Sequence, residues 1–332
     1  MSSGNFSTIP LNVIQLQQAS RYLCVIFGFL VLVTGLCGNL LNILVIITSQ
    51  NYKHNATSLY MLVQSFLNFN TLLVGLSSRI LGTGFQIDLT LTSRAWCKMR
   101  SSFIDIHTQS AYTLLCLQSI DTFISSSPSA VVRQKSTVRT ARYFIFGAIC
   151  FWVLHEIPYY FLQDLVVIEN TSMCIMTNAI YAKYRSYFTY LGIYTLIPVI
   201  VISIFGSLTY YHMTRFGTGR TPSAFTRQMV NMALFQIIAV ILFNVPYAGE
   251  QIYFLTTTNL VKDAYRRAQE QLVSSIFAVY GYGPYMASLI IVSLTHFIFL
   301  FGFRVHSIVT VCQSGFENNF LPVLNGYFGI DK

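Results

Sequence analysis

Charged residues are scarce in this sequence: they make up 9% of its 332 residues, whereas hydrophobic residues make up 54%. An ordinary soluble domain carries roughly 25% charged residues. A chain of this length cannot bury so much apolar surface in its own core. The composition therefore excludes an ordinary soluble protein and predicts that lipid solvates much of the surface.

Sequence patterns typical of enzymes are also missing. The chain has no Gly-rich phosphate loop, no Cys or His pair at metal-ligand spacing and no Gly-x-Ser-x-Gly turn around a nucleophile. We therefore expect no catalysis, no cofactor and no metal site. The net charge of +9 is carried mainly in short loops, so it predicts contact with membrane lipid rather than with nucleic acid.

Seven apolar stretches approach or exceed the roughly 20 residues that a membrane-spanning helix needs. They run about 22–48, 58–82, 99–124, 143–166, 186–212, 229–255 and 274–302. The sequence thus predicts an all-α membrane protein, a seven-transmembrane helix bundle over 22–302. A tail, 1–21, precedes it, and a short amphipathic helix with a cytoplasmic tail, 303–332, follows it. We expect longer loops near 166–185 and 256–273.

Buried polar groups are concentrated in the third stretch, which contains Asp105, His107, Gln109 and Gln118. Polar side chains that face lipid are costly, so other helices are expected to surround this one. The chain has no internal repeat, which weighs against transporters built from duplicated halves. The acidic residues expected inside the membrane are Asp105, Asp121 and Glu156, a sparse path for a solute. A small-solute transporter or channel is therefore only an alternative.

Lys and Arg are almost evenly divided between the two sides, so they do not fix the orientation. Possible glycosylation triplets begin at Asn5 and Asn170 on one side and at Asn55 on the other. Two sites against one favour an extracellular N-terminus in the plasma membrane. The basic loop 133–142, which contains no acidic residue, would then be cytoplasmic.

Two cysteines, Cys97 and Cys174, are the only ones expected outside the membrane on the oxidising side. A disulfide between them would tie the loop after the fourth span to the start of the third. Two unrelated buried thiols are the alternative. Cys24, Cys37 and the other cysteines within spans are expected to be packing residues.

Several features, in this order along the chain, resemble those of rhodopsin-like G-protein-coupled receptors. They are Gly38-Asn39, Trp96-Cys97, Asp121, Trp152, Pro198, Pro246 and Phe303-Arg304. The resemblance covers roughly residues 22–312. It implies a receptor that binds an extracellular ligand, of peptide or chemosensory kind, and signals to a heterotrimeric G protein through an outward swing of the sixth helix.

The residues of the family's conformational switch depart from the usual pattern. The Asp-Arg-Tyr triplet reads Asp121-Thr122-Phe123, so the arginine that meets the G protein is absent. The sixth helix reads Phe243-Asn244-Val245-Pro246, and the seventh-helix tyrosine corresponds to Phe297. With Asn39, and Asn68 in place of the second-helix aspartate, these positions are the expected switch. A non-signalling decoy or partner subunit is therefore a second reading.

The ligand is expected between the outer halves of the third, fifth, sixth and seventh spans. The residues expected there are Ile104, Asp105, Thr108, Tyr190, Tyr247, Gln251 and Tyr282. Receptors for amines carry an aspartate at the position of Ile104, so an amine ligand is not expected. No lysine occurs in 274–302, which excludes a retinal Schiff base at the family's usual place.

Overall fold

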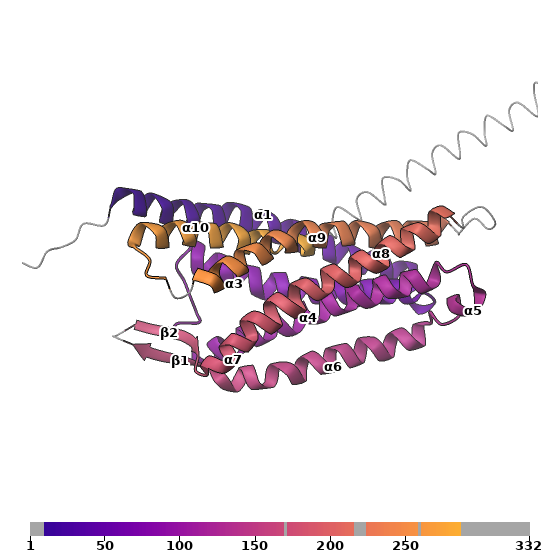
Figure 1. Ribbon diagram of the computed structural model, residues 1–332, viewed down its shortest axis with the longest axis horizontal. Helices are drawn as coiled ribbons and strands as arrows, with labels where there is room; N and C mark the ends of the chain where they lie inside the picture. The colour runs from indigo at the N-terminus through magenta and orange to yellow at the C-terminus, as the bar shows by residue number, and fades with distance from the viewer. Residues whose placement is uncertain (1–9, 169–170, 216–223, 258–259, 287–332) are drawn as a thin grey trace, which may run out of the picture. The chain divides into compact units, whose positions relative to one another are not determined.

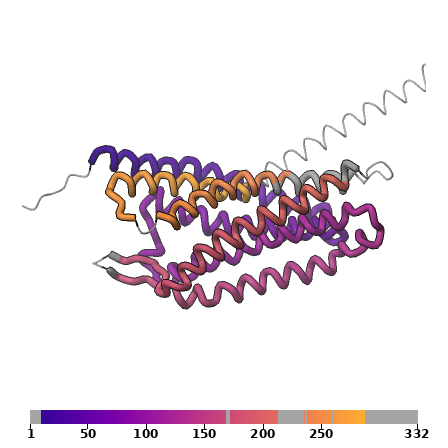
Figure 2. The backbone as a smooth tube through the Cα atoms, in the orientation of Figure 1, coloured from indigo at the N-terminus to yellow at the C-terminus, as the bar shows by residue number. Residues whose placement is uncertain are grey.

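The computed structural model describes residues 10–168, 171–215, 224–257 and 260–286 (Figure 1). The chain divides into two compact units between Leu289 and Ile290, and all of the described residues belong to the first. That unit is mostly helical and contains one two-stranded hairpin (Figures 1 and 2).

The first half of the chain forms five helical segments, four of which correspond to predicted spans and one of which, α5, lies in a predicted loop. They are α1 (Leu11–Ser49) with the 3-10 turn η1 (Asn51–Lys53), α2 (Ala56–Thr71) continued by η2 (Leu72–Leu76), α3 (Ser77–Arg79) and η3 (Ile80–Gly84), α4 (Arg94–Ser125), α5 (Ala130–Arg133) and α6 (Val138–Leu162). η2 and η3 are π-helical, so the second span is wound more widely near α3. Side-chain caps at Asn55, Ser93 and Thr137 fix the starts of α2, α4 and α6.

The second half begins with the hairpin of β1 (Gln163–Ile168) and β2 (Thr171–Met176). It continues as α7 (Ala179–Tyr184), the π-helical η4 (Arg185–Leu196), α8 (Ile197–Arg215), α9 (Ala224–Thr257) and α10 (Ala264–Tyr280). Pro198 lacks the N–H that would bond the carbonyl of Tyr194, and the wide winding of η4 ends just before it. We call the end of this unit that carries the hairpin the hairpin end, and the end that carries α5 the α5 end (Figure 1).

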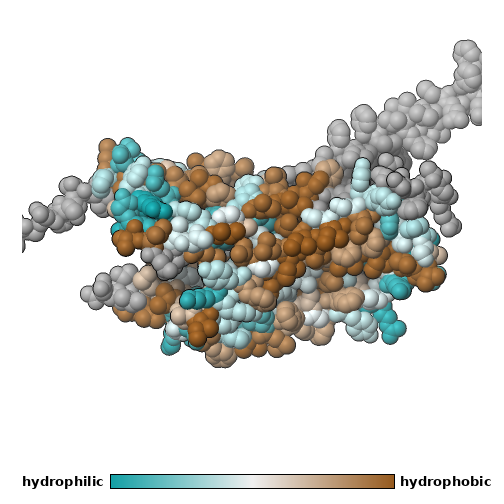
Figure 3. Space-filling model, viewed as in Figure 1, coloured by the Kyte–Doolittle hydropathy of each residue, from teal (hydrophilic) through white to brown (hydrophobic). Residues whose placement is uncertain are grey.

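Five helical stretches among the described residues are long and apolar enough to cross a membrane. They are Leu11–Ser49, Ala56–Gly84, Val138–Leu162, Ala179–His212 and Ile238–Thr257. Large apolar side chains such as Leu30, Phe146 and Phe161 are exposed on them, and hydrophobic surface covers much of the face seen in Figure 3. So much exposed apolar surface is that of a membrane protein.

α4 is long enough to span a membrane but is not among these five, because it carries many polar residues. It is surrounded as predicted: α2, α6, α8, α9 and η4 all contact it. Asp105, Gln109 and Gln118 are each at most 7% exposed. The other helices thus shield its polar side chains from lipid.

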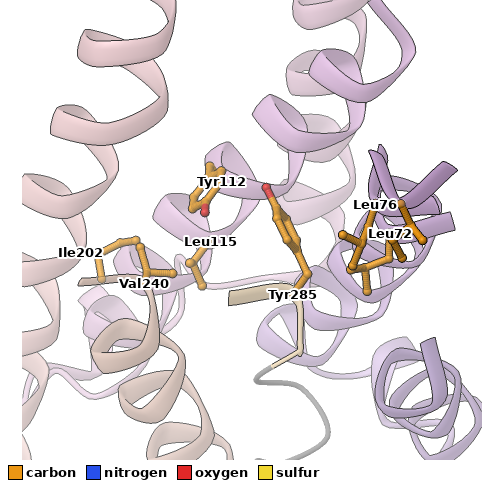
Figure 4. Close-up of a cluster of buried hydrophobic side chains, with 8 residues drawn as sticks. Leu72, Leu76, Tyr112, Leu115, Ile202, Val240 and Tyr285 are labelled. Atoms are coloured by element: carbon orange, nitrogen blue, oxygen red, sulfur yellow. The ribbon is translucent and has the colours of Figure 1, made fainter. Parts of the chain in front are cut away.

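A cluster of buried hydrophobic residues joins the second span, α4, α8, α9 and the residues after α10. Its members are Leu72, Leu76, Ile80, Tyr112, Leu115, Ile202, Val240 and Tyr285. Figure 4 shows Tyr285 between the leucines of η2 and the side chains of Tyr112 and Leu115. Close packing rather than transfer from water favours such contacts in lipid. Gly35 allows α1 to approach, since a Cβ there would lie 2.6 Å from a methyl carbon of Leu72.

Three boundaries differ from the sequence-based prediction. α1 begins at Leu11, within the expected tail 1–21, and residues 163–166 of the expected fourth span form β1. Most of the expected loop 256–273 is the start of α10, which Asp263 caps. These segments were missed because they are amphipathic or short, and an apolar window detects only uniformly hydrophobic helices.

Candidate ligand cavity

A cavity of about 220 Å³ lies at the hairpin end, among α2, α3, α4, η4, α9 and α10. Six of the seven residues predicted to meet a ligand line it: Ile104, Asp105, Thr108, Tyr190, Tyr247 and Tyr282. Gln251 is not in its wall and donates instead to Glu250, at 2.8 Å. The second span also contributes Thr71 and Arg79, which the sequence analysis had not placed there.

The predicted disulfide between Cys97 and Cys174 is confirmed, with a Cα–Cα distance of 5.7 Å. It attaches β2 to the first turn of α4. A second connection joins the same elements, because Arg94 donates to both carboxylate oxygens of Asp164 in β1, at 2.6 and 2.5 Å. This guanidinium holds the pKa of the Asp164 carboxyl well below its usual range. The hairpin is thus fixed to the helix that forms one wall of the cavity.

A buried group of charges centres on Arg185, whose side chain is 6% exposed. It forms an ion pair with Asp105 of α4, and its Nη1 lies 3.0 Å from Oε2 of Glu156 in α6. Three helical segments therefore meet at one guanidinium. His107, two residues further along α4, takes no part in this group, since its ring nitrogen lies 2.8 Å from the Phe103 carbonyl oxygen.

Aromatic side chains complete the surroundings of Arg185. The guanidinium carbon lies 3.4 Å from the centre of the Tyr159 ring, and Nε donates to the Tyr190 hydroxyl at 3.0 Å. Glu156 is also bonded to His155, at 3.1 Å. The guanidinium and the carboxylates thus offset part of the cost of burying one another.

Two further arginines, Arg79 and Arg100, line the cavity itself. Nε of Arg100 donates to Ser78 at 2.6 Å, and neither arginine forms an ion pair with a described residue. Nε of Arg79 is buried without a hydrogen-bond partner within the described part of the chain. In the sequence, each of these arginines is a cation inside or beside an apolar stretch, but the sequence does not indicate a partner for it.

Tyrosines form much of the rest of the wall. The Tyr194 and Tyr285 hydroxyls lie 3.3 Å apart. The hydroxyl of Tyr112 in α4 donates to Asn244 of α9 at 2.9 Å. Gly75 leaves room for the phenol of Tyr282, since a Cβ at position 75 would be 2.8 Å from the Tyr282 hydroxyl oxygen. Hydroxyl groups therefore connect the cavity with the centre of α9.

Phe243 and Pro246 of the expected switch lie in α9, beside the end of α10. The Phe243 ring packs on Tyr280, with centroids 4.7 Å apart, and contacts Gly283. Pro246 cannot donate to the carbonyl of Leu242, and the Tyr280 hydroxyl donates to that oxygen at 3.0 Å. The carbonyl that Pro246 leaves without its helical donor is thus bonded by the residue that ends α10.

Three more switch residues, Asn39, Asn68 and Asp121, lie closer to the α5 end. Asn39 donates to the backbone oxygen of Tyr285 at 2.8 Å, and Asn68 borders a small cavity of about 20 Å³. Asp121 accepts from Thr57 at 3.1 Å and from Ser136 at 2.7 Å. These bonds connect α1 with the residues after α10, and α2 and the residues before α6 with α4.

Thr122 and Phe123 both face other parts of the bundle. Thr122 is 3% exposed, and its hydroxyl donates to the Gln118 carbonyl at 2.7 Å. Phe123 stacks on His212, with centroids 4.9 Å apart. Thr122 therefore presents neither a charge nor a free hydroxyl at the α5 end.

Three predicted positions, Phe297, Asn5 and Asn170, lie outside the described residues, as does the expected tail 303–332. No group of three His, Cys, Asp or Glu side chains that could hold a metal ion occurs in the part of the chain that is described. Glu250, which was expected outside the membrane, is 7% exposed in α9.

No protein-family model matches this chain, and no curated protein is significantly similar to it. The case for a function therefore depends on the geometry of the cavity and of the groups around it.

Proposed function

We propose that the chain is a seven-span receptor of the plasma membrane, of the rhodopsin-like G-protein-coupled kind, with its N-terminus and hairpin end outside. The observation that carries this proposal is the cavity at the hairpin end, where helical segments from five predicted spans meet. Ligand sites between the helices of a bundle are common, and this one combines apolar, aromatic and charged groups. The disulfide-linked hairpin lies at the same end.

Signalling in this proposal runs along α9. A ligand beside Tyr247 contacts α9 next to Pro246, where one backbone hydrogen bond is missing and the Tyr280 hydroxyl replaces it. A ligand that favours one arrangement of this bend shifts the population between two packings of the α5 end. The cytoplasmic partner would be a heterotrimeric G protein.

A non-signalling decoy or partner subunit is the second candidate, and one observation favours it. Thr122 stands at the position of the family's arginine, and its hydroxyl donates to the Gln118 carbonyl. The natural chain then offers the G protein no cation at this place. The scaffold could still bind a ligand while failing to couple.

The test is basal G-protein turnover in cells that express the natural chain, Thr122→Arg or Thr122→Ser at matched surface levels. No ligand is needed when turnover is compared with an empty vector. Turnover by the natural chain would support the receptor. Turnover by Thr122→Arg alone would favour the decoy, because a restored cation then suffices to couple the scaffold.

The Thr122→Ser variant is the matched control, because it retains the hydroxyl that bonds Gln118 and adds no charge. It should behave as the natural chain does. Solute flux or current through the purified protein in vesicles, with no turnover from any version, would contradict both receptor readings and favour the transporter.

A further inference from the structure

We infer that the cavity at the hairpin end binds a small organic anion, an aromatic ring that bears a carboxylate. Only the role of this ligand as a signal depends on the proposed function. Its binding follows from the charges and the size of the cavity.

The one acidic side chain in the cavity wall is already neutralised. Asp105 forms an ion pair with Arg185 and accepts from the Tyr190 hydroxyl at 3.4 Å. A cationic ligand would have to displace Arg185 from this carboxylate and would leave the arginine buried without a full set of partners. Such a loss is strongly unfavourable. The wall therefore does not suit an amine.

The cations in the wall, by contrast, are not neutralised within it. Arg100 has only the Ser78 hydroxyl as a hydrogen-bonding partner among the described side chains, and Arg79 has an unbonded Nε. Glu250 lies close enough to Arg79 to interact with it electrostatically, but it is outside the wall and forms no ion pair with it. Arg100 thus has no carboxylate to balance it. Guanidinium groups bind carboxylates through paired, charge-assisted hydrogen bonds.

The remainder of the cavity suits one aromatic ring. Four further tyrosines line the cavity: Tyr194, Tyr247, Tyr282 and Tyr285. A dry cavity of about 150 Å³ is known to hold benzene. The volume of about 220 Å³ leaves room for a ring and a carboxylate but not for a folded peptide.

The experiment uses the full chain in nanodiscs of neutral lipid and measures thermal unfolding with millimolar benzoate or phenylacetate. The matched probes are benzamide, which keeps the shape without the charge, and benzylamine, which reverses the charge. A ligand that binds the folded state raises the unfolding temperature. We expect a rise with the two carboxylates that exceeds any rise with the amide or the amine.

Arg100→Gln should weaken carboxylate binding by about 10-fold to 100-fold, the loss of one charge-assisted pair. Arg100→Lys should retain part of the affinity, and Arg139→Gln, an exposed arginine at the α5 end, should retain all of it. Unfolding of each variant without a probe shows that it is folded. Arg79→Gln is the second variant and should also weaken binding.

Equal stabilisation by benzamide and benzoate, or stronger stabilisation by benzylamine, would overturn the inference. So would carboxylate binding that Arg100→Gln and Arg79→Gln both leave unchanged. The benzoate titration is then repeated in nanodiscs of anionic lipid, and again with a long-chain fatty acid as competitor. Loss of benzoate binding in either experiment would assign the site to a lipid acid rather than to a soluble carboxylate. Because no probe needs a G protein, a failure to couple does not affect these results.

Discussion

The hairpin end and the α5 end of the protein both bury polar groups, but they satisfy them differently. At the hairpin end, Arg185 is held between two carboxylates from two other segments. At the α5 end, Asp121 is a partly buried carboxylate, and its partners are the hydroxyls of Thr57 and Ser136. Among the described residues, Arg185 at the hairpin end is thus held by ion pairs, and Asp121 at the α5 end by hydrogen bonds from hydroxyls.

This difference bears on which end can rearrange. Removing one member of a buried ion pair costs about 3–5 kcal/mol, whereas a hydrogen bond between membrane helices contributes on average about 0.6 kcal/mol. Neutral bonds such as Tyr112 to Asn244 can therefore be exchanged for others at little cost. The proposed receptor function would require such a difference, with the ligand at the fixed end and the partner at the exchangeable one.

The largest expected effect comes from breaking the charged group itself. Arg185→Ala leaves Asp105 and Glu156 without their common cation, and we expect it to lower the free energy of unfolding by about 3–5 kcal/mol. Thermal unfolding of the full chain in nanodiscs measures this loss.

Arg139→Ala is the matched control, because Arg139 is exposed at the α5 end. The triple variant Arg185→Met, Asp105→Asn, Glu156→Gln should recover most of the stability, since no charge is then left unpaired. If Arg185→Ala unfolds no more readily than Arg139→Ala, the hairpin end is not held by its ion pairs.

A smaller effect is expected when one chemical change is made at both ends. Asp121→Asn keeps one acceptor for the Thr57 or Ser136 hydroxyl and relieves the burial of a charge, so stability should change by about 1 kcal/mol or less. Asp105→Asn should cost more, because it removes half of the carboxylate charge around Arg185.

Both carboxamide variants can be compared in one thermal-unfolding series. Equal losses of stability from Asp105→Asn and Asp121→Asn would mean that the two ends are not held differently. A loss of stability from Asp121→Asn alone would mean that the α5 end depends more on its carboxylate than the hairpin end does.

Much of the helical arrangement could be predicted from the sequence because lipid imposes a simple rule. An apolar stretch of sufficient length must be a helix in the bilayer core, since its backbone groups find no other partners. The same rule predicts that a polar helix such as α4 is enclosed. Ile104 and Thr108, about three and four turns into α4, therefore meet residues of other helices in the cavity.

Long-range pairing of charges could not be predicted in this way. Arg185 lies in η4 and meets Asp105 and Glu156, which are distant from it in sequence. Periodicity and hydropathy describe single helices, and the choice of partners depends on how α4, α6 and η4 pack together.

The smallest expected effect lies at the surface of the hairpin end, in the pair Arg94 and Asp164. The pKa of Asp164 is lowered, chiefly by the hydrogen bond from Arg94, so the folded state binds a proton less readily than the unfolded state. The stabilisation is complete above the unfolded-state pKa of about 3.9 and is lost as the pH falls toward the folded-state pKa. Asp164→Asn should thus be slightly less stable than the natural chain at about pH 7, and the gap should narrow below about pH 4. Arg94 is 69% exposed on its side chain, so solvent and salt screen the pair, and unfolding at high salt should show almost no gap. A gap that widens in acid would mean that Asp164 is not stabilised as a carboxylate.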